Sequence, residues 1–463
     1  MGKEYSFGID LNQLVEEPQL DLFIKDKLAI ESDYYEMDKI ISAYQEFENK
    51  HPIKIINRNQ FNTPVNFKQA KQFPRHRWYT YKEGFSPQFV EDFIRRFSQN
   101  SNDIVFDPFG GIGTTVLQSS ILNHQSYSND INPLSNYVAS IKTNAYTKED
   151  IDEINSAYES LIRSNLNLKS NPPFSETVTK YFSQETLESI LITQKWISDI
   201  ESDKVRNVFS LALLTILETL STHKKDGNGV KRKNYSGQNF SLQNINELIG
   251  QKLKMFIDDI SSTSINIKPI IKHQSSFDEY KLNQKADIVI TSPPYANCFD
   301  YSKVYLVELW FGGFFKSAND QKTFRQSSIT SHVHYKWEPR HKEFGNELVN
   351  NQIASYLHNK KLWDKKIPDM LTGYFSDMGK VLYELIPNLN RNATIGIVVG
   401  NSVYGGLPIA SDILLSQIAI KAGFELIGIE SYRTLTPSSQ QLKIMRDIDK
   451  KYLRESLIIL KWK

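Results

Sequence analysis

The sequence predicts an α/β protein built on a mainly parallel β-sheet with helices on both faces. Short apolar strands near 104–106, 287–290 and 394–399 are separated by helical stretches. Strands that alternate with helices are typical of parallel sheets, because each helix carries the chain back across a face of the sheet. The chain has 463 residues, 40% of them hydrophobic, which is enough for two or three units and a large core.

The apolar periodicity and the turn residues place the elements in order along the chain. Residues 1–50 are predicted to be helical, and 147–265 mainly helical, with helices near 205–220 and 244–260. Between these two helices, the glycines of the basic segment Lys224–Lys233 predict a flexible loop. The remaining elements are helices at 114–122, 373–385 and 409–422 and strands at 104–106, 125–129, 287–290, 394–399, 424–430 and 457–460.

Composition excludes several classes of protein. A single cysteine, Cys298, excludes a disulfide framework and a multi-cysteine zinc site. His332, His334 and His341 lack acidic or cysteine ligands at a suitable spacing, so no metal is expected. The longest apolar run, Phe209–Leu217, is far shorter than the ~20 residues that span a bilayer. With no apolar signal core at the N-terminus, we expect a cytoplasmic protein without a membrane partner.

The net charge of +2 hides a division along the chain. Residues 1–50 hold five Lys and twelve acidic residues, a net of −7, which leaves +9 for residues 51–463. The segment Lys54–Lys82 has seven Lys or Arg, no acid and six interleaved aromatic residues. Cations neutralise phosphates and aromatic rings stack on bases, so this mixture suits a nucleic-acid groove. A surface loop with anchored aromatic residues has the same composition.

The segment Asp107–Thr115 is a glycine-rich turn between a strand and a helix. Asp130 follows at the end of the next strand, where a carboxylate accepts hydrogen bonds from the ribose of a nucleoside cofactor. A dinucleotide would need a third glycine at 116, where this chain has Val. Asp107 would repel a pyrophosphate but suits a cationic amine. The turn therefore favours S-adenosylmethionine over a nicotinamide cofactor or a turn without a ligand.

The segment Ser292-Pro293-Pro294-Tyr295 follows the strand 287–290. Two prolines force a rigid extended turn and remove two N–H donors, so the turn presents backbone carbonyls and the Ser292 hydroxyl. These acceptors suit an exocyclic amine whose nitrogen becomes tetrahedral, and they favour its transition state. Tyr295 can stack on a base.

Together, these motifs resemble those of the S-adenosylmethionine-dependent DNA amino-methyltransferases. The resemblance covers roughly 80–145, 270–310 and 373–463 and implies a Rossmann-like class I methyltransferase sheet of seven strands with a reversed last hairpin. It implies Ser292, Pro293, Pro294 and Tyr295 as catalytic residues. It implies a cofactor site made by Tyr81, Phe85, Ser86, Asp107, Pro108, Phe109, Gly111, Gly113, Thr114, Thr115, Asp130, Ile131 and Gln274. Gln274 is the weakest of these, because the family has an acid near that position.

The resemblance also implies the reaction and its partners. A base in double-stranded DNA is flipped out and its exocyclic amine is methylated, with a cognate restriction endonuclease as a candidate partner in a restriction-modification or epigenetic system. Serine in the tetrapeptide favours cytosine N4, with adenine N6 as the alternative. An RNA amino-methyltransferase and a non-catalytic DNA-recognition subunit remain further alternatives.

These motifs divide the chain into six parts. The methyltransferase domain comprises 51–146, the catalytic part 266–315 and the C-terminal part 373–463. An acidic helical arm (1–50) precedes it. A helical insertion (147–265) and a basic, aromatic insertion (316–372) interrupt it and are candidates for DNA recognition. Lys224–Lys233 and Lys322–Lys342 are the expected DNA contacts, and we expect the arm to pack away from the DNA and limit indiscriminate binding.

Overall fold

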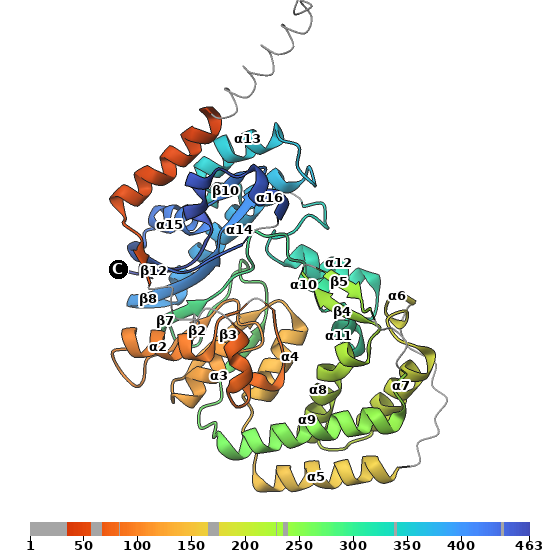
Figure 1. The fold of residues 1–463 in the computed structure, drawn as a ribbon. Helices are drawn as coiled ribbons and strands as arrows, with labels where there is room; N and C mark the ends of the chain where they lie inside the picture. Colours follow the sequence, from red (N-terminus) through yellow and green to blue (C-terminus); the bar gives the residue numbers. More distant parts are fainter. Residues whose placement is uncertain are drawn as a thin grey trace, which may run out of the picture.

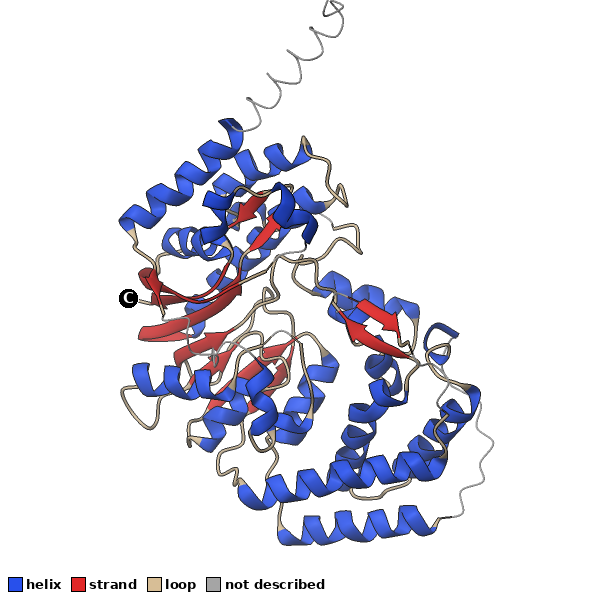
Figure 2. Ribbon diagram, viewed as in Figure 1, coloured by secondary structure: helices blue, strands red, loops and turns tan. Residues whose placement is uncertain are grey.

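The computed structural model describes residues 35–56, 67–82, 84–164, 176–227, 229–234, 239–337, 340–436 and 439–463. None of the helices in these ranges combines the length and apolar character needed to cross a membrane. The described chain forms one large sheet flanked by helices, with a mainly helical region to one side (Figures 1 and 2).

The main sheet has eight strands in the order β1-β11-β12-β8-β7-β2-β3-β6. Only β12 runs antiparallel to its neighbours, β11 and β8. Without β1, this is the predicted seven-stranded sheet with a reversed last hairpin, so the predicted fold class is confirmed. The strands are β1 (Lys54–Ile55), β2 (Val105–Asp107), β3 (Ser126–Asp130), β6 (Ile270–His273), β7 (Ala286–Thr291), β8 (Leu389–Gly400), β11 (Glu425–Thr434) and β12 (Arg454–Lys461).

Helices cover both faces of the sheet because the central strands are apolar on both sides. On β7, Ile288 and Ile290 pack with α2 (Pro87–Phe97), whereas Val289 belongs to the core that includes α14 (Ile367–Leu385) and α15 (Ser411–Lys421). This burial on both faces is what the continuous apolar run 288–290 predicts. Two more helices, α3 (Thr114–Ile121) and α4 (Pro133–Lys142), follow β2 and β3.

The region 147–265 is mainly helical, as predicted, and has its own apolar core. The basic segment expected to be a flexible loop is instead an antiparallel hairpin of β4 (His223–Asp226) and β5 (Gly229–Arg232), in which Asp226 pairs with Gly229. Gly227 adopts a φ of 52°, which a tight hairpin connection needs. The helices are α5 (Lys148–Arg163), α6 (Glu176–Thr179), α7 (Gln184–Ser198), α8 (Asp203–Leu220) and α9 (Leu242–Ser262).

The described part of the cationic, aromatic segment 54–82 packs inward. Trp78 is buried, stacks on Phe256 and donates from Nε1 to Oδ2 of Asp259 at 2.9 Å. Arg77 pairs with the same carboxylate, and the buried Arg75 donates to backbone carbonyls. These groups anchor η2 (Phe67–Gln72) and η3 (His76–Trp78) to α9, so they do not form the nucleic-acid groove that composition suggested.

The helix 35–50 is the described part of the expected acidic arm. Its apolar face is buried, and the hydroxyl of Tyr44 donates to the carbonyl of Pro408 at 3.3 Å. Asp38 pairs with Arg446, and Glu48 pairs with Arg454 at 2.9 Å. The helix lies at the end of the molecule opposite α5 (Figure 1). Residues 1–34 of the expected arm lie outside the described residues.

The insertion 316–372 and the C-terminal part contain short elements around the sheet. Helix α14 begins at Ile367, six positions before the predicted start at residue 373. The other elements are α10 (Tyr301–Val304), α11 (Leu306–Phe311), α12 (Ala318–Ser327), η4 (Lys342–Phe344), η5 (Val349–Ile353), α13 (Ala354–His358), η6 (Ile386–Asn388), β9 (Ser402–Tyr404), β10 (Leu407–Ile409), α16 (Ser439–Ile444) and η7 (Asp447–Tyr452).

Candidate active site

A pocket lies at the carboxyl ends of β2, β3 and β7. Open α/β sheets bind ligands at this edge. The pocket brings the glycine turn after β2 together with the proline turn after β7. The predicted site residues that line it are Tyr81, Phe85, Asp107, Phe109, Gly111, Thr114, Asp130, Ile131, Ser292 and Pro294.

The other predicted residues lie outside the lining and have different contacts. Ser86 caps the N-terminus of α2, because its Oγ accepts from Phe89 N at 3.2 Å. Gln274 is not in the lining: its amide Nε2 donates to the carbonyl of Glu279 at 2.7 Å, whereas the neighbouring Ser275 and Ser276 line the pocket. Pro108, Gly113, Thr115, Pro293 and Tyr295 are also absent from the lining.

The carboxylate of Asp107 connects the two turns. It accepts from Thr115 Oγ1 at 2.6 Å, from Thr291 Oγ1 at 2.8 Å and from Phe109 N at 3.0 Å. Burial raises the pKa of Asp107 to about 6, although these hydrogen bonds act to lower it. Thr291 is adjacent to Ser292, so the position of the proline turn depends on this buried carboxylate.

Asp130, at the end of β3, is hydrogen-bonded to the backbone of the glycine turn. Its Oδ2 accepts from Gly111 N and its Oδ1 accepts from Asn132 N, each at 2.7 Å. Burial raises the pKa of Asp130 to about 6 as well. Each carboxylate oxygen has two lone pairs, so each keeps capacity to accept one more hydrogen bond.

Two glycines of the turn are required by packing. Gly113 has a φ of 78°, and a Cβ there would lie 2.7 Å from the Cβ of Ala139 on α4. A Cβ on Gly110, which was not among the predicted site residues, would lie 1.8 Å from Ser128 Oγ. The turn therefore comes closer to β3 and α4 than a side chain would allow.

The proline turn is held in place by side chains of β12 and β11, which lie beyond β8 in the sheet. Ser292 Oγ donates to Tyr295 Oη at 3.4 Å, and Tyr295 Oη donates to Glu455 Oε1 at 2.9 Å. Glu455 on β12 is held in turn by Arg433 on β11. A Cβ at Gly400 would lie 2.8 Å from the Tyr295 ring, so the ring packs directly on the β8 backbone.

Aromatic rings form one wall of the pocket. Tyr81 stacks on Tyr305 with ring centroids 4.9 Å apart and an interplanar angle of 10°. Tyr81 also stacks on Tyr301, and Phe299 packs edge-on against Tyr301. Phe299 and Tyr301 follow the proline turn in sequence, but neither was predicted as a site residue.

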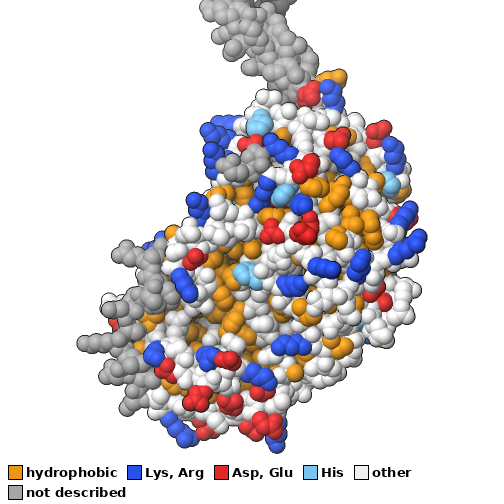
Figure 3. All heavy atoms as spheres, turned by 180° about the vertical axis from the view of Figure 1, so that it is seen from behind, with side chains coloured by type: hydrophobic (Ala, Val, Ile, Leu, Met, Phe, Trp, Pro, Cys, Tyr) orange, Lys and Arg blue, Asp and Glu red, His pale blue; other side chains and the backbone are white. Residues whose placement is uncertain are grey.

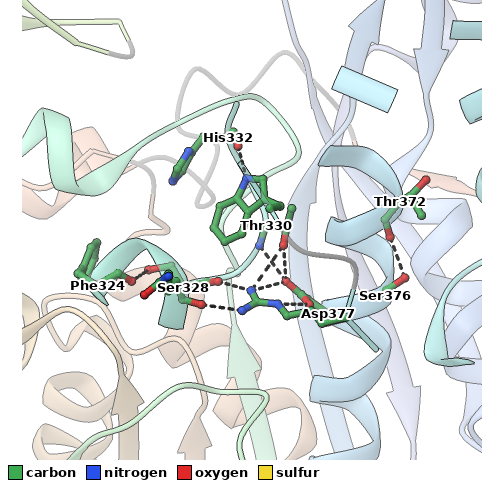
Figure 4. Close-up of polar contacts among 10 residues, drawn as sticks. Phe324, Ser328, Thr330, His332, Thr372, Ser376 and Asp377 are labelled. Atoms are coloured by element: carbon green, nitrogen blue, oxygen red, sulfur yellow. Dashed lines mark hydrogen bonds and ion pairs between the residues drawn. The ribbon is translucent and has the colours of Figure 1, made fainter. Parts of the chain in front are cut away.

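The segment 327–332 forms another wall that the sequence analysis missed, including Ser328, Ile329 and His332. It is attached to α14 through the buried Asp377, which accepts from Thr330 N and Oγ1 (Figure 4). Arg340 bridges the two parts: it donates to both Asp377 oxygens and to the carbonyls of Gln326 and Ser328.

This attachment engages two of the five basic residues of the segment Lys322–Lys342, whereas Lys322, Lys336 and Lys342 are exposed, so its expected contact with DNA stays a prediction. Arg340 pairs internally with Asp377, and Arg325 pairs with the buried Asp300 at 2.7 Å. Both side chains are largely buried, so they stabilise the pocket wall.

Asp300, His332 and His334 bring one potential metal-ligand atom each within 4.8 Å of one another. Arg325 donates to Asp300, and Lys303 Nζ lies 3.4 Å from His334 Nε2. Two cationic side chains beside the group oppose binding of a metal cation.

Comparisons with known proteins identify relatives of this chain. The family model described as a DNA methylase, of the N6/N4 type, matches residues 10–142. The Type II methyltransferase M.BsoBI of Geobacillus stearothermophilus is 27% identical over 430 residues, covering 81% of this chain and 84% of the relative. M.AvaI of Nostoc sp. is 26% identical over 401 residues, covering 78% of this chain and 81% of the relative. The family model and these relatives support assignment of the chain to the DNA amino-methyltransferases. That assignment supports S-adenosylmethionine as the methyl donor.

Two further matches are more limited. The Type II methyltransferase M.MvaI of Kocuria varians is 26% identical over 286 residues, covering 56% of this chain and 61% of the relative. Among solved structures, TrmN from Thermus thermophilus aligns with 86% of this chain and 53% of its own at 8% identity, with a TM-score of 0.28. That structural likeness is too low to support an argument, and the fold assignment rests on the strand order.

Lys142 is hydrogen-bonded to the glycine turn of the methyltransferase. No signal in the sequence predicted this contact. Its fully buried Nζ donates to the carbonyl of Ile112 at 2.9 Å. Burial lowers the pKa of Lys142 to about 7. An unfolded lysine has a pKa of roughly 10.4, so the folded state releases this proton at lower pH than the unfolded state does.

We predict that wild-type stability gains a contribution as the pH rises from about 7 to about 10, because the folded state binds fewer protons in that window. Lys142→Met removes this contribution. At about pH 7 the variant should be more stable than the wild type by about 1–4 kcal/mol, as when a buried charge is replaced by an apolar group. Urea unfolding at about pH 7 and pH 9 measures the difference, which should shrink at the higher pH.

Lys148→Met, at an exposed position on α5, is the matched control and should show no such trend. A stability difference between wild type and Lys142→Met that is the same at both pH values would contradict the lowered pKa of Lys142.

Proposed function

We propose that the methyltransferase transfers a methyl group to cytosine N4 of a flipped base in double-stranded DNA. The observation that carries this proposal is the shared pocket: Ser292 and Pro294 line the same cavity as Asp107 and Asp130. A cofactor bound along the glycine turn is thereby adjacent to a turn suited to hold an amine. Proximity of this kind accelerates a direct transfer without a covalent enzyme intermediate.

The pocket residues fit S-adenosylmethionine in charge and in hydrogen-bonding capacity. Asp107 is placed to attract the cationic methionine amine, and Asp130 has lone pairs available for the ribose hydroxyls. Ser275 and Ser276 supply hydroxyls near β6, where the family has an acid for the adenine amine. When bound, the cofactor supplies an electrophilic methyl group on a sulfonium.

Ser292 and the backbone carbonyls of the proline turn are proposed to hold the target amine. An amine nitrogen becomes tetrahedral as it attacks, and its N–H bonds then point toward acceptors that are out of line in the planar base. Acceptors fixed in advance therefore stabilise the transition state more than the ground state. The brace from Tyr295 to Glu455 and Arg433 keeps the turn in place.

The hairpin β4–β5 is the proposed DNA contact. Lys224, Lys231 and Arg232 are exposed, whereas Lys225 pairs with the buried Glu308. Lys233 donates to three carbonyls at the end of α8, which fixes the base of the hairpin. The tip lies beside the pocket wall, because Lys82 Nζ donates to Gly227 O at 3.2 Å.

Surface charge alone does not single out a DNA-binding face. On the face opposite to that of Figure 1, Lys and Arg side chains are spread out and mixed with acidic ones (Figure 3). The hairpin is favoured because it combines exposed cations, rigid attachment and closeness to the pocket.

The relatives named as Type II methyltransferases support a further part of the proposal. We infer that the protein is the modification enzyme of a type II restriction-modification system, and a restriction endonuclease that reads the same sequence would be its cognate partner.

The function is tested by nucleoside mass spectrometry of DNA from cells that express the protein. We expect new 4-methylcytosine, and its loss in the Ser292→Ala variant, because the amine then lacks its hydroxyl acceptor. New 6-methyladenine without 4-methylcytosine would change the assigned target from cytosine N4 to adenine N6. Purified protein that methylates neither base in any duplex, with S-adenosylmethionine present, would contradict the enzyme assignment.

The hairpin is tested by replacing Lys224, Lys231 and Arg232 with Ala. We expect duplex DNA to bind about 10-fold more weakly at low salt, with a slope of log affinity against log salt that is smaller by about 2–3. Affinity for S-adenosylmethionine should not change. Replacement of the exposed Lys39, Lys50 and Lys421, far from the pocket, is the control. Equal DNA affinity in both triple variants would exclude the hairpin as the DNA contact.

A further inference from the structure

His332 is a buried pocket residue to which the proposed function assigns no role. Its side chain is 3% exposed, and it lines the cavity together with Ser292 and Pro294. Its ring Nδ1 has no hydrogen-bond partner among the described residues. A buried polar atom without a partner is costly, so this atom is expected to meet a ligand in the cavity.

The position of the ring is fixed by its surroundings. The backbone carbonyl of His332 accepts from Trp337 Nε1 at 2.5 Å, and the ring packs against Trp337 with centroids 5.2 Å apart. Two residues earlier, Thr330 is hydrogen-bonded to Asp377 on α14. The His332 side chain points away from Asp377 (Figure 4).

Asp300 determines which ring nitrogen carries the proton. Its Oδ1 lies 3.9 Å from Nε2 of His332, and its carboxylate also accepts from Ser302 and Arg325. Burial acts to raise the pKa of Asp300, but His332, Ser302 and Arg325 hold it below its usual value, so Asp300 is ionised at neutral pH. A negative charge beside Nε2 favours the proton there and leaves the lone pair on Nδ1.

The imidazole is neutral at physiological pH. Burial, with smaller contributions from Arg325 and His334, lowers the pKa of His332 to about 4 against the opposing effect of Asp300. Other charged groups beside this cluster are Lys303, near His334, and Lys366, which donates to the carbonyl of Val333. A neutral ring with a free lone pair is a hydrogen-bond acceptor and a proton acceptor.

We infer that Nδ1 of His332 takes the proton that the target amine loses during methyl transfer. The inference rests on the proposed function. Ser292 and the carbonyls of the proline turn hold the amine, but a hydroxyl and an amide carbonyl are weak proton acceptors. His332 is the neutral imidazole that lines the same cavity, with Asp300 as the group that orients it.

The step balances without another reactant. The amine nitrogen bonds to the methyl carbon as the carbon–sulfur bond breaks, and that electron pair goes to sulfur. One N–H proton passes to Nδ1 of His332, and the nitrogen keeps the electron pair of that bond. The imidazolium is stabilised by Asp300 and, with a pKa of about 4, returns the proton to water after the product leaves.

The test compares His332→Phe, which keeps a ring without an acceptor, with His332→Asn, whose amide oxygen lies close to the position of Nδ1. Single-turnover methyl transfer should fall about 10²-fold or more in the Phe variant, and the Asn variant should recover part of the loss. Dissociation constants for S-adenosylmethionine and for duplex DNA should stay within about threefold in both, since acid–base groups act on the chemical step. Asp300→Asn should also slow the step.

The matched control is His358→Phe on α13, where an exposed His lies 3.7 Å from Asp369. It should leave the rate unchanged. A His332→Phe variant that binds both ligands and transfers methyl within about threefold of wild type would overturn the inference, since general acid–base catalysis contributes far more than that. Wild-type activity that is lost on chelation and restored by zinc would also overturn it. Absence of wild-type methylation would instead reject the proposed function itself.

Discussion

The buried carboxylate of Asp107 is the interaction on which the site depends. Isolated in an apolar core, a carboxylate would be strongly destabilising, so it requires hydrogen-bond donors. Its two hydroxyl donors come from Thr115 on α3 and Thr291 at the end of β7. The same contacts that satisfy the charge therefore fix the glycine turn relative to the proline turn. The turns proposed to bind the cofactor and the amine therefore share one edge of the sheet.

A second layer of buried charge holds the loops around this edge. Glu455 with Arg433 braces Tyr295, and Asp377 with Arg340 attaches the segment 327–332. Burying such pairs adds little net stability, but removing one partner leaves an uncompensated charge. Their effect is to restrict each loop to one position, which suits a site that must align an amine with a methyl group. The guanidinium groups of Arg340 and Arg433 are engaged by these buried acids.

Local signals in the sequence were sufficient for the sheet and for the two turns. The apolar runs near β2, β7 and β8 and the glycine and proline turns each depend on neighbouring residues, and the strand order follows from the resemblance. The wall at 327–332, the hydrogen bond from Lys142 to Ile112 and the hydrogen bond from Ser276 to Pro108 depend on contacts between distant segments. Composition also misled: Arg325 and Arg340 count as basic residues in the sequence, but each has a buried acid partner. The glycines of the hairpin β4–β5 predicted a flexible loop, although a two-residue Gly-Asn connection between extended segments also predicts a hairpin.

The central claim is that ionised Asp107 and Asp130 hold the cofactor, and calorimetric titration of S-adenosylmethionine against pH tests it directly. Both carboxyls have a pKa near 6, so they are neutral below that pH and charged above it. The affinity should be low at about pH 5, rise through about pH 6 and level off above about pH 7. Unfolding measured at each pH confirms that the protein remains folded. The same affinity at about pH 5 and pH 7.5 in folded protein would contradict the account.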